Sequence, residues 1–577
     1  MSTEKRALLA IALSILVIAV WTAFFAPRPK PPVPPQPAPE EAAPATTPEA
    51  AQPLPAQAER PANETAPAAA ATEAKEFIVE TQTYSIRLGN RGGRILSWRL
   101  LKYVDDLKVP LDLIPRGQEE LQEYPLRIVV AGDDALTKKL DEALYSEEVR
   151  DAKPEDPWPA KGFNGRIVAF AFSDGAGLVA TKQLAIPQDG YVGYVKASLR
   201  QGGAEPPFEL TWAVGLPEPN DDKTTRIFHA EGQGIAWFNA GAHRFPAGNV
   251  SAPTGLGGAS GPGALLWGGI ESTYFASLLL PEPADGSRMT LVPAGEIPQG
   301  PAGKKGPVIA ARFAAAGAGS FTAVVGPKDY DLLSSIGRGL DRAIDFSRYS
   351  LIYVLTKYAF LALRWVNKFA GNYGVSIILL TIAIRVVFFP ITYRSAITMR
   401  QSAKKMAKIQ PRVKAIQERY RKMKRTMETQ RQMNDEIMNI YRKEGVNPMG
   451  SLGGCLPLLL QMPVFIAFYN LLSVTIELRG AAFFLWIQDL SRMDPYYIWP
   501  ILMGVSWMVQ QWMTSSTIPD PMQRRMMAVM PIVFTFMMFR MPSGLVIYWF
   551  FSNVVGLAQQ YMINKQADKE TAEAAGS

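Results

Sequence analysis

Six long apolar stretches constrain this chain more than any other feature of its sequence. They occupy residues 7–25, 375–391, 452–476, 497–513, 526–539 and 545–563. A helix needs about 20 apolar residues to cross a bilayer, and somewhat fewer where the bilayer thins. Lysines and arginines lie at alternate ends of the stretches, which places both termini in the cytoplasm. The pattern predicts a multi-domain membrane protein with a six-span α-helical membrane domain.

The first stretch has a second interpretation, because Lys5 and Arg6 before an apolar run are also typical of a signal peptide. No convincing small-x-small cleavage site closes the run, so residues 1–26 are interpreted as an uncleaved transmembrane anchor. Residues 27–75 contain 14 prolines among many alanines and glutamates. Such a composition buries too little apolar surface to fold, which predicts a disordered linker.

A different sequence pattern begins after the linker and predicts a second domain, residues 76–335. Short β-rich runs such as Phe77-Ile78-Val79 and residues 166–170 alternate with clusters of glycine, proline and aspartate. This pattern is typical of a large antiparallel β-sandwich. Because the domain follows an anchor whose N-terminus is cytoplasmic, we expect it on the other side of the membrane, outside the cytoplasm.

Residues 336–372 contain an apolar segment, 351–369, that is long enough to span but carries Lys357, Arg364 and Lys368. A spanning helix there would invert every later loop and place the basic segment outside. The segment is therefore interpreted as an amphipathic helix on the outer membrane surface. The remaining ranges are 373–393 for the second transmembrane helix, 394–448 for a basic cytoplasmic segment, 449–564 for four transmembrane helices, and 565–577 for a cytoplasmic tail.

The basic cytoplasmic segment concentrates positive charge. Residues 394–443 contain 15 lysines and arginines against four carboxylates, a net charge of +11. Apolar residues between Met406 and Met427 keep a 3–4 spacing, which predicts a helix with one apolar seam. The segment is either a loop held near anionic lipids or a contact site for ribosomal RNA or a nascent chain. The candidate contact residues are Met406, Arg412, Arg419, Met423 and Met427.

Arg385 lies inside the second apolar stretch, where a cation costs about 2.5–3.5 kcal/mol on insertion scales. One interpretation is that its side chain snorkels toward the cytoplasmic end near Thr392. No aspartate or glutamate lies well inside any stretch to pair with it. An unpaired intramembrane arginine instead favours a water-filled cavity.

Several classes of function are weakened or excluded by composition. One cysteine (Cys455) and two histidines (His229 and His243) exclude a disulfide framework and leave almost nothing for a metal site. Residues 300–305, GPAGKK, lack the spacing of a phosphate-binding loop, and no nucleophile–base set is apparent. We therefore expect no enzyme activity, no cofactor, no metal and no nucleotide.

Several motifs between about residues 350 and 564 resemble the YidC membrane protein insertase family. They are Val446-Asn447-Pro448, Gly453-Gly454-Cys455-Leu456-Pro457, Gln461-Met462-Pro463-Val464-Phe465, Asp494-Pro495-Tyr496-Tyr497, Asp520-Pro521-Met522-Gln523 and Pro542-Ser543-Gly544-Leu545. The resemblance implies a β-supersandwich for the periplasmic domain and a cytoplasmic helical hairpin for the basic segment. It also implies insertion and folding of new membrane proteins, alone or with the Sec translocon.

The resemblance further implies a hydrophilic groove that is open to the cytoplasm and to lipid. It assigns Arg385 and Thr381 to this groove, and a substrate-contacting pair to Tyr548 and Trp549. Family members commonly carry two tyrosines there, so Trp549 departs from the pattern. The motif residues Gln461 and Pro463 complete the expected groove. The implied partners are nascent membrane proteins, the translocon components SecYEG and SecDF, the ribosome and anionic lipids.

Two other classes of protein remain as alternatives. A polytopic transporter would predict inverted repeats and intramembrane acidic residues, and neither is apparent. A membrane-anchored, sugar-binding protein would need a histidine and glutamate cluster in the outer domain. The available candidates for such a cluster are His229, Glu231 and His243.

Overall fold

The structure is a computed structural model that describes most of residues 70–576. The ranges outside the description are 1–69, 106–107, 116, 118–120, 122, 217–231, 259–262, 285–286, 300–303, 348, 424–425, 444–455, 516–520 and 577. The predicted anchor 1–26 and most of the predicted linker therefore lie outside the described residues. The chain divides into two units, one of residues 1–64 and 417–436 and the other of residues 65–416 and 437–577.

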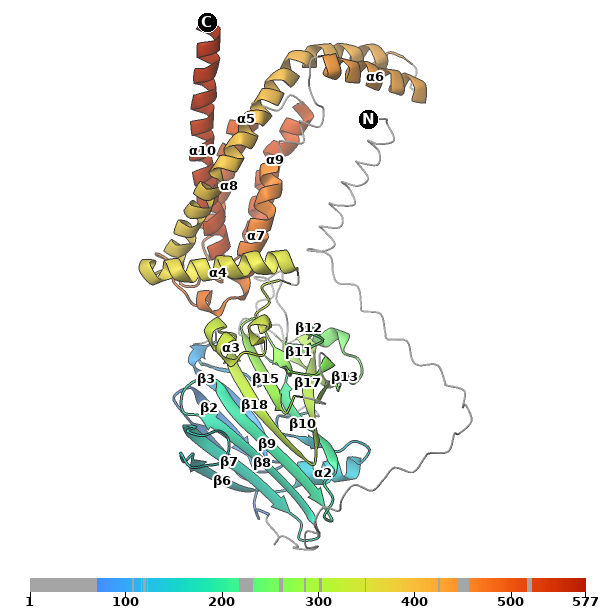
Figure 1. Cartoon of the computed structure of the whole chain (residues 1–577), viewed down its shortest axis with the longest axis vertical. Helices are drawn as coiled ribbons and strands as arrows, with labels where there is room; N and C mark the ends of the chain where they lie inside the picture. The colour runs from blue at the N-terminus through green and yellow to red at the C-terminus, as the bar shows by residue number, and fades with distance from the viewer. Residues whose placement is uncertain are drawn as a thin grey trace, which may run out of the picture. The chain divides into compact units, whose positions relative to one another are not determined.

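Strands dominate the described part of residues 76–327 (Figure 1). They are β1 (Glu76–Glu80), β2 (Tyr84–Gly89), β3 (Arg94–Val104), β4 (Pro110–Asp112), β5 (Ile128–Val129), β6 (Ser146–Asp151), β7 (Gly165–Ser173), β8 (Leu178–Pro187), β9 (Val192–Gln201), β10 (Pro207–Val214), β11 (Gln233–Phe238), β12 (Gly241–Phe245), β13 (Thr254–Gly257), β14 (Trp267–Glu271), β15 (Phe275–Glu282), β16 (Arg288–Gln299), β17 (Lys304–Ala316) and β18 (Ala318–Pro327). One short helix, α2 (Asp134–Glu142), interrupts them.

The strands form two sheets. A four-stranded sheet has the order β1-β2-β3-β4, and a 14-stranded sheet follows the path β12-β11-β14-β15-β18-β9-β8-β7-β6. The strand β17 pairs with β18 of that path and also with β10 and β16. The last two strands of the sheet lie beyond these, with β5 paired to β10 and β13 paired to β16. The pairings among these described strands are antiparallel, so the predicted antiparallel β-rich domain is confirmed.

Alternation of side chains along the strands builds the core of this domain. In β2, Tyr84, Ile86 and Leu88 are buried, because residues two apart point to the same face of a sheet. The same period places Lys182 on the buried face of β8, where it is 1% exposed. Its Nζ donates to the carbonyl oxygens of Gly92 at 2.5 Å and Gly93 at 3.3 Å. Burial lowers the pKa of the Lys182 amine from 10.5 to about 7.

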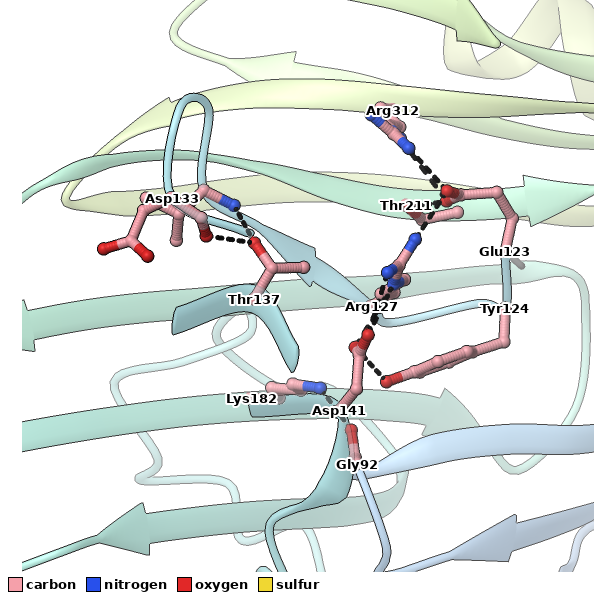
Figure 2. A network of polar contacts seen from close by, with 11 residues as sticks. Gly92, Glu123, Tyr124, Arg127, Asp133, Thr137, Asp141, Lys182, Thr211 and Arg312 are labelled. Atoms are coloured by element: carbon pink, nitrogen blue, oxygen red, sulfur yellow. Dashed lines mark hydrogen bonds and ion pairs between the residues drawn. The ribbon is translucent and has the colours of Figure 1, made fainter. Parts of the chain in front are cut away.

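A second buried polar network joins segments that are far apart in sequence (Figure 2). Glu123 accepts hydrogen bonds from Arg127 at 2.7 Å, from the hydroxyl of Thr211 at 2.8 Å, and from Arg312. Arg127 also donates to Asp141, at 2.8 Å from its Nη2. Because Glu123 is only 2% exposed, these donors replace the water that the carboxylate loses on folding.

Helices dominate the rest of the chain (Figure 1). They are α3 (Tyr330–Ile336), α4 (Ser350–Ala370), α5 (Tyr373–Arg421), α6 (Met427–Lys443), α7 (Leu456–Val474), α8 (Ile498–Ser515), α9 (Pro521–Met538) and α10 (Ser543–Gly576). A buried apolar cluster joins several of them through Phe360 of α4, Ile377 of α5, Leu471 of α7 and Val546 of α10.

The helix α4 has two apolar faces. Tyr353, Phe360 and Leu363 are buried, whereas Tyr358 is 67% and Trp365 61% exposed. One face of α4 therefore packs against the rest of the protein, and the other face exposes large aromatic side chains. A helix is therefore present where residues 351–369 were predicted to form one, and its place on the membrane surface stays a prediction.

The helices give partial support to the predicted spans. Within the described residues, only Tyr373–Arg394 is both long and apolar enough to cross a membrane by itself. Gln461–Val474 and Val529–Met538 are shorter apolar helices. The number of six spans therefore stays a prediction.

Candidate functional site

Arg385 lies on the inner side of helix α5, away from the exposed apolar side of that helix. Ile382 and Val386 are exposed, as a bilayer would favour, whereas Ile377 and Thr381 are buried. Residues 377, 381 and 385 follow a spacing of four, so they lie on one side of the helix. Arg385 is half-buried on this inner side.

A cavity of about 40 Å³ lies beside Arg385. Its lining comes from α5, α7 and α10 and consists of Thr381, Ile384, Arg385, Phe388, Thr392, Gln461, Val464, Tyr548, Ser552 and Gln559. This volume has room for a few water molecules, because one water needs about 10–15 Å³. Seven of these ten side chains are polar, and none carries a carboxylate.

Hydrogen bonds join the polar residues of this cavity. Arg385 donates to the hydroxyl oxygen of Ser552 from Nε at 2.9 Å and from Nη2 at 2.5 Å. The amide of Gln559 donates to the backbone oxygen of Arg385 at 3.0 Å. Gln461 donates to the Tyr548 hydroxyl at 2.8 Å. The three helices are therefore connected by polar contacts at the depth of Arg385.

Four residues that the sequence assigned to a groove come together in this cavity, namely Arg385, Thr381, Gln461 and Tyr548. The hydroxyl of Thr381 donates to the Ile377 carbonyl of its own helix at 2.6 Å. Thr381 therefore adds a polar oxygen to the lining of the cavity while its own hydroxyl proton is already hydrogen-bonded.

Two other predicted groove residues lie outside the cavity lining. Trp549 packs instead against Phe465 and Phe534, with ring centroids 4.5 and 4.6 Å away. Neighbours on a helix point about 100° apart, so Tyr548 and Trp549 face different surroundings. Pro463 lies inside α7 and also does not line the cavity. The assignment of Trp549 and Pro463 to the groove stays a prediction.

Sequence reasoning missed Ser552 and Gln559. Both lie on the same face of α10 as Tyr548, four and eleven residues further along. Polar residues that share one face of an otherwise apolar helix were the available signal.

The basic cytoplasmic segment forms the end of α5 and the helix α6. Within residues 417–436, Arg419 of α5 makes an ion pair with Glu436 of α6. The helix α5 ends at Arg421, and α6 begins at Met427. Met423 is 46% and Met427 76% exposed.

The other two predicted contact residues of this segment lie earlier on α5. The Arg412 side chain is exposed, and Met406 is part of the same helix. Within the described residues, no three metal-ligating side chains lie together.

Comparison with known proteins covers nearly the whole chain. Residues 365–570 match the family described as 60Kd inner membrane protein, and residues 76–362 match the YidC periplasmic domain. The chain is 32% identical to the membrane protein insertase YidC of Syntrophus aciditrophicus (strain SB), over 98% of this chain and 100% of the relative.

One further relative and one solved structure are also similar to this chain. The insertase YidC of Geobacter metallireducens is also 32% identical, over 97% of this chain and 98% of the relative. The crystal structure of YidC from Thermotoga maritima is 14% identical with a TM-score of 0.31, over 85% of this chain and 99% of that one.

The matched families place residues 365–570 in an inner membrane protein and residues 76–362 in its periplasmic domain, as expected from the sequence. Because the relatives match over nearly their full length at 32% identity, the chain belongs to the YidC family of membrane protein insertases.

Proposed function

We propose that this insertase admits the polar tail of a new membrane protein to the cavity around Arg385. The observation that supports this role is a guanidinium that donates to the neutral hydroxyl of Ser552, in a cavity whose described lining residues include no carboxylate. Such a charge keeps its attraction for anionic and polar groups. An ionisable residue within a membrane helix is by default a candidate for function.

The cavity would lower the cost of moving a polar tail through the membrane. A polar group that loses water without a new partner costs several kcal/mol in hydrocarbon. Water, Arg385 and the amide of Gln461 would supply such partners along the inner half of the path. The apolar segment of the substrate would then leave sideways into lipid, driven by hydrophobic partition and by the membrane potential. No bond is made or broken, and no cofactor takes part.

The wider assignments are part of the same proposal. Six spans would hold the cavity in the bacterial inner membrane with both termini in the cytoplasm, and α4 would lie on the outer membrane surface. The exposed cations and methionines of α5 and α6 would contact the ribosome, nascent chains and anionic lipids. SecYEG and SecDF are the proposed translocon partners for substrates that need them.

Photo-crosslinking tests whether substrate enters the cavity. A photo-reactive amino acid at Thr381 would be combined with ribosomes arrested while they translate a short single-span membrane protein. We expect an adduct with the apolar segment of the nascent chain. An adduct from Met423 without one from Thr381 would indicate docking outside the cavity and contradict the proposal.

Substitution of Arg385 tests the role of its charge. We expect Arg385→Ala to abolish insertion of a substrate with an acidic tail and Arg385→Lys to preserve it, because lysine keeps the positive charge. Protease protection of the translocated tail in inverted membrane vesicles measures the result. Normal insertion by both variants would refute a role for the charge.

A further inference from the structure

The Arg385 guanidinium is held by one neutral residue. Its Nε and Nη2 both donate to the hydroxyl oxygen of Ser552, which is 3% exposed. Gln559, seven residues further on α10, donates to the backbone oxygen of the same arginine. The helix α10 thus holds Arg385 at two points, through its side chain and through its backbone.

The neutrality of the Ser552 anchor has an electrostatic consequence. Arginine pairs with a carboxylate through two parallel hydrogen bonds, and such a pair cancels the net charge at the site. A hydroxyl can accept the same two donors but carries no charge. Among the described residues that line the cavity none is a carboxylate, so the positive charge is oriented and has no compensating charge among them.

The anchor also opposes snorkelling. A flexible arginine in a membrane helix turns its charged end toward the nearest aqueous interface. Thr392 at the cytoplasmic side of the cavity is seven residues away, about 10 Å along the helix. The two bonds to Ser552 direct the side chain toward α10, and not along α5 toward that end.

We propose that Ser552 is a positioning residue for Arg385: its hydroxyl orients the guanidinium at the cavity, and the preference of the cavity for anionic tails depends on that orientation. This inference rests on the proposed function, because it names the residue that orients the arginine of the same cavity. Ser552 acts through Arg385, and its hydroxyl is the chemical group that matters.

The experiment compares two tails on one single-span test protein. The tails differ only in carrying two aspartates or two asparagines, and a photo-crosslinker at Phe388, in the cavity lining, reports entry. The measured quantity is the ratio of acidic-tail to neutral-tail adducts for the full-length protein in membrane vesicles. A ratio cancels changes in expression and general loss of activity.

Three substitutions at Ser552 give distinct expectations. Ser552→Ala should lower the ratio about tenfold, the factor that one charge-assisted hydrogen bond contributes. Ser552→Thr should restore it, because threonine keeps the hydroxyl. Ser552→Asp should remove the preference, because a carboxylate there neutralises Arg385. The matched control Ser506→Ala removes another buried hydroxyl, on α8, that Arg385 does not contact.

The outcomes separate this inference from the proposed function. If the wild type forms adducts that depend on Arg385, but Ser552→Ala and Ser552→Asp keep its ratio, this inference is overturned and the proposed function stands. If the wild type forms no adduct and Arg385→Ala inserts normally, both fail. Should Ser552→Asp not accumulate in the membrane, the contrast between Ser552→Ala and Ser552→Thr decides.

Discussion

The buried amine of Lys182 makes the stability of the β-rich domain depend on pH. In the folded chain, burial lowers the pKa of Lys182 to about 7, whereas the ordinary value of 10.5 applies to the unfolded chain. Between these values the unfolded chain binds one more proton at this site than the folded chain. Raising the pH within that window therefore favours folding, and below about pH 7 this contribution no longer changes.

The size of the effect follows from the two pKa values. Each unit of difference between the two pKa values corresponds to about 1.4 kcal/mol of unfolding free energy. The slope of this free energy against pH is halved near the folded pKa, where half of the Lys182 amines are protonated. The contribution of Lys182 to the free energy of unfolding should therefore rise by about 2 kcal/mol between pH 7 and pH 9. The side chain is 1% exposed, so solvent screening does not reduce this value greatly.

The substitution Lys182→Met isolates this term, because methionine fills similar space without a titratable group. Urea unfolding of the full-length protein in detergent, followed by pulse proteolysis of the β-rich domain, measures both proteins from pH 6 to pH 9. We expect the stability of the wild type relative to Lys182→Met to increase by about 2 kcal/mol above pH 7. The matched control is Lys196→Met on the adjacent strand β9, whose side chain is exposed. A difference that stays constant across this pH range would refute the reasoning.

Two further predictions concern packing. Glu123→Ala should destabilise the β-rich domain by about 1–3 kcal/mol, because it removes the carboxylate that Arg127 and Arg312 share while leaving Asp141 to Arg127 and Glu209 to Arg312; a urea midpoint equal to that of the wild type would contradict this. Gly504→Ala should lower the thermal stability of the helical part by about 1–3 kcal/mol, because the added Cβ would lie 2.2 Å from the hydroxyl of Thr535. Thermal unfolding in detergent measures this loss. Adding Thr535→Ala to Gly504→Ala should recover most of the lost stability. An unchanged transition temperature for Gly504→Ala alone would contradict the predicted clash.

Much of the architecture could be predicted from the sequence because it depends on local periodicity. Apolar residues two apart produced the buried face of β2, and a spacing of three to four produced the two faces of α4. Arg385 was also identified from sequence, since a cation within an apolar stretch is conspicuous without knowledge of its neighbours. The first predicted span and the motif around Cys455 lie outside the described residues.

Features that depend on the orientation of neighbouring helices required the structure. Tyr548 and Trp549 are adjacent in sequence, yet only Tyr548 faces the cavity. The break in the helix between Arg421 and Met427 has neither glycine nor proline in its sequence, so composition did not mark it. Its position is set by where α5 ends and α6 begins.

The sequence by itself indicated that most of residues 76–327 form an antiparallel β-rich domain, that helices follow it, and that a lone cation lies within an apolar helix. Only the tertiary structure decided what surrounds that cation. Ser552 is 167 residues from Arg385, just as Arg312 is 189 residues from Glu123. Hydrogen-bond partners so far apart in sequence are brought together by the packing of whole helices and strands. The periodicity of a single segment does not encode that packing.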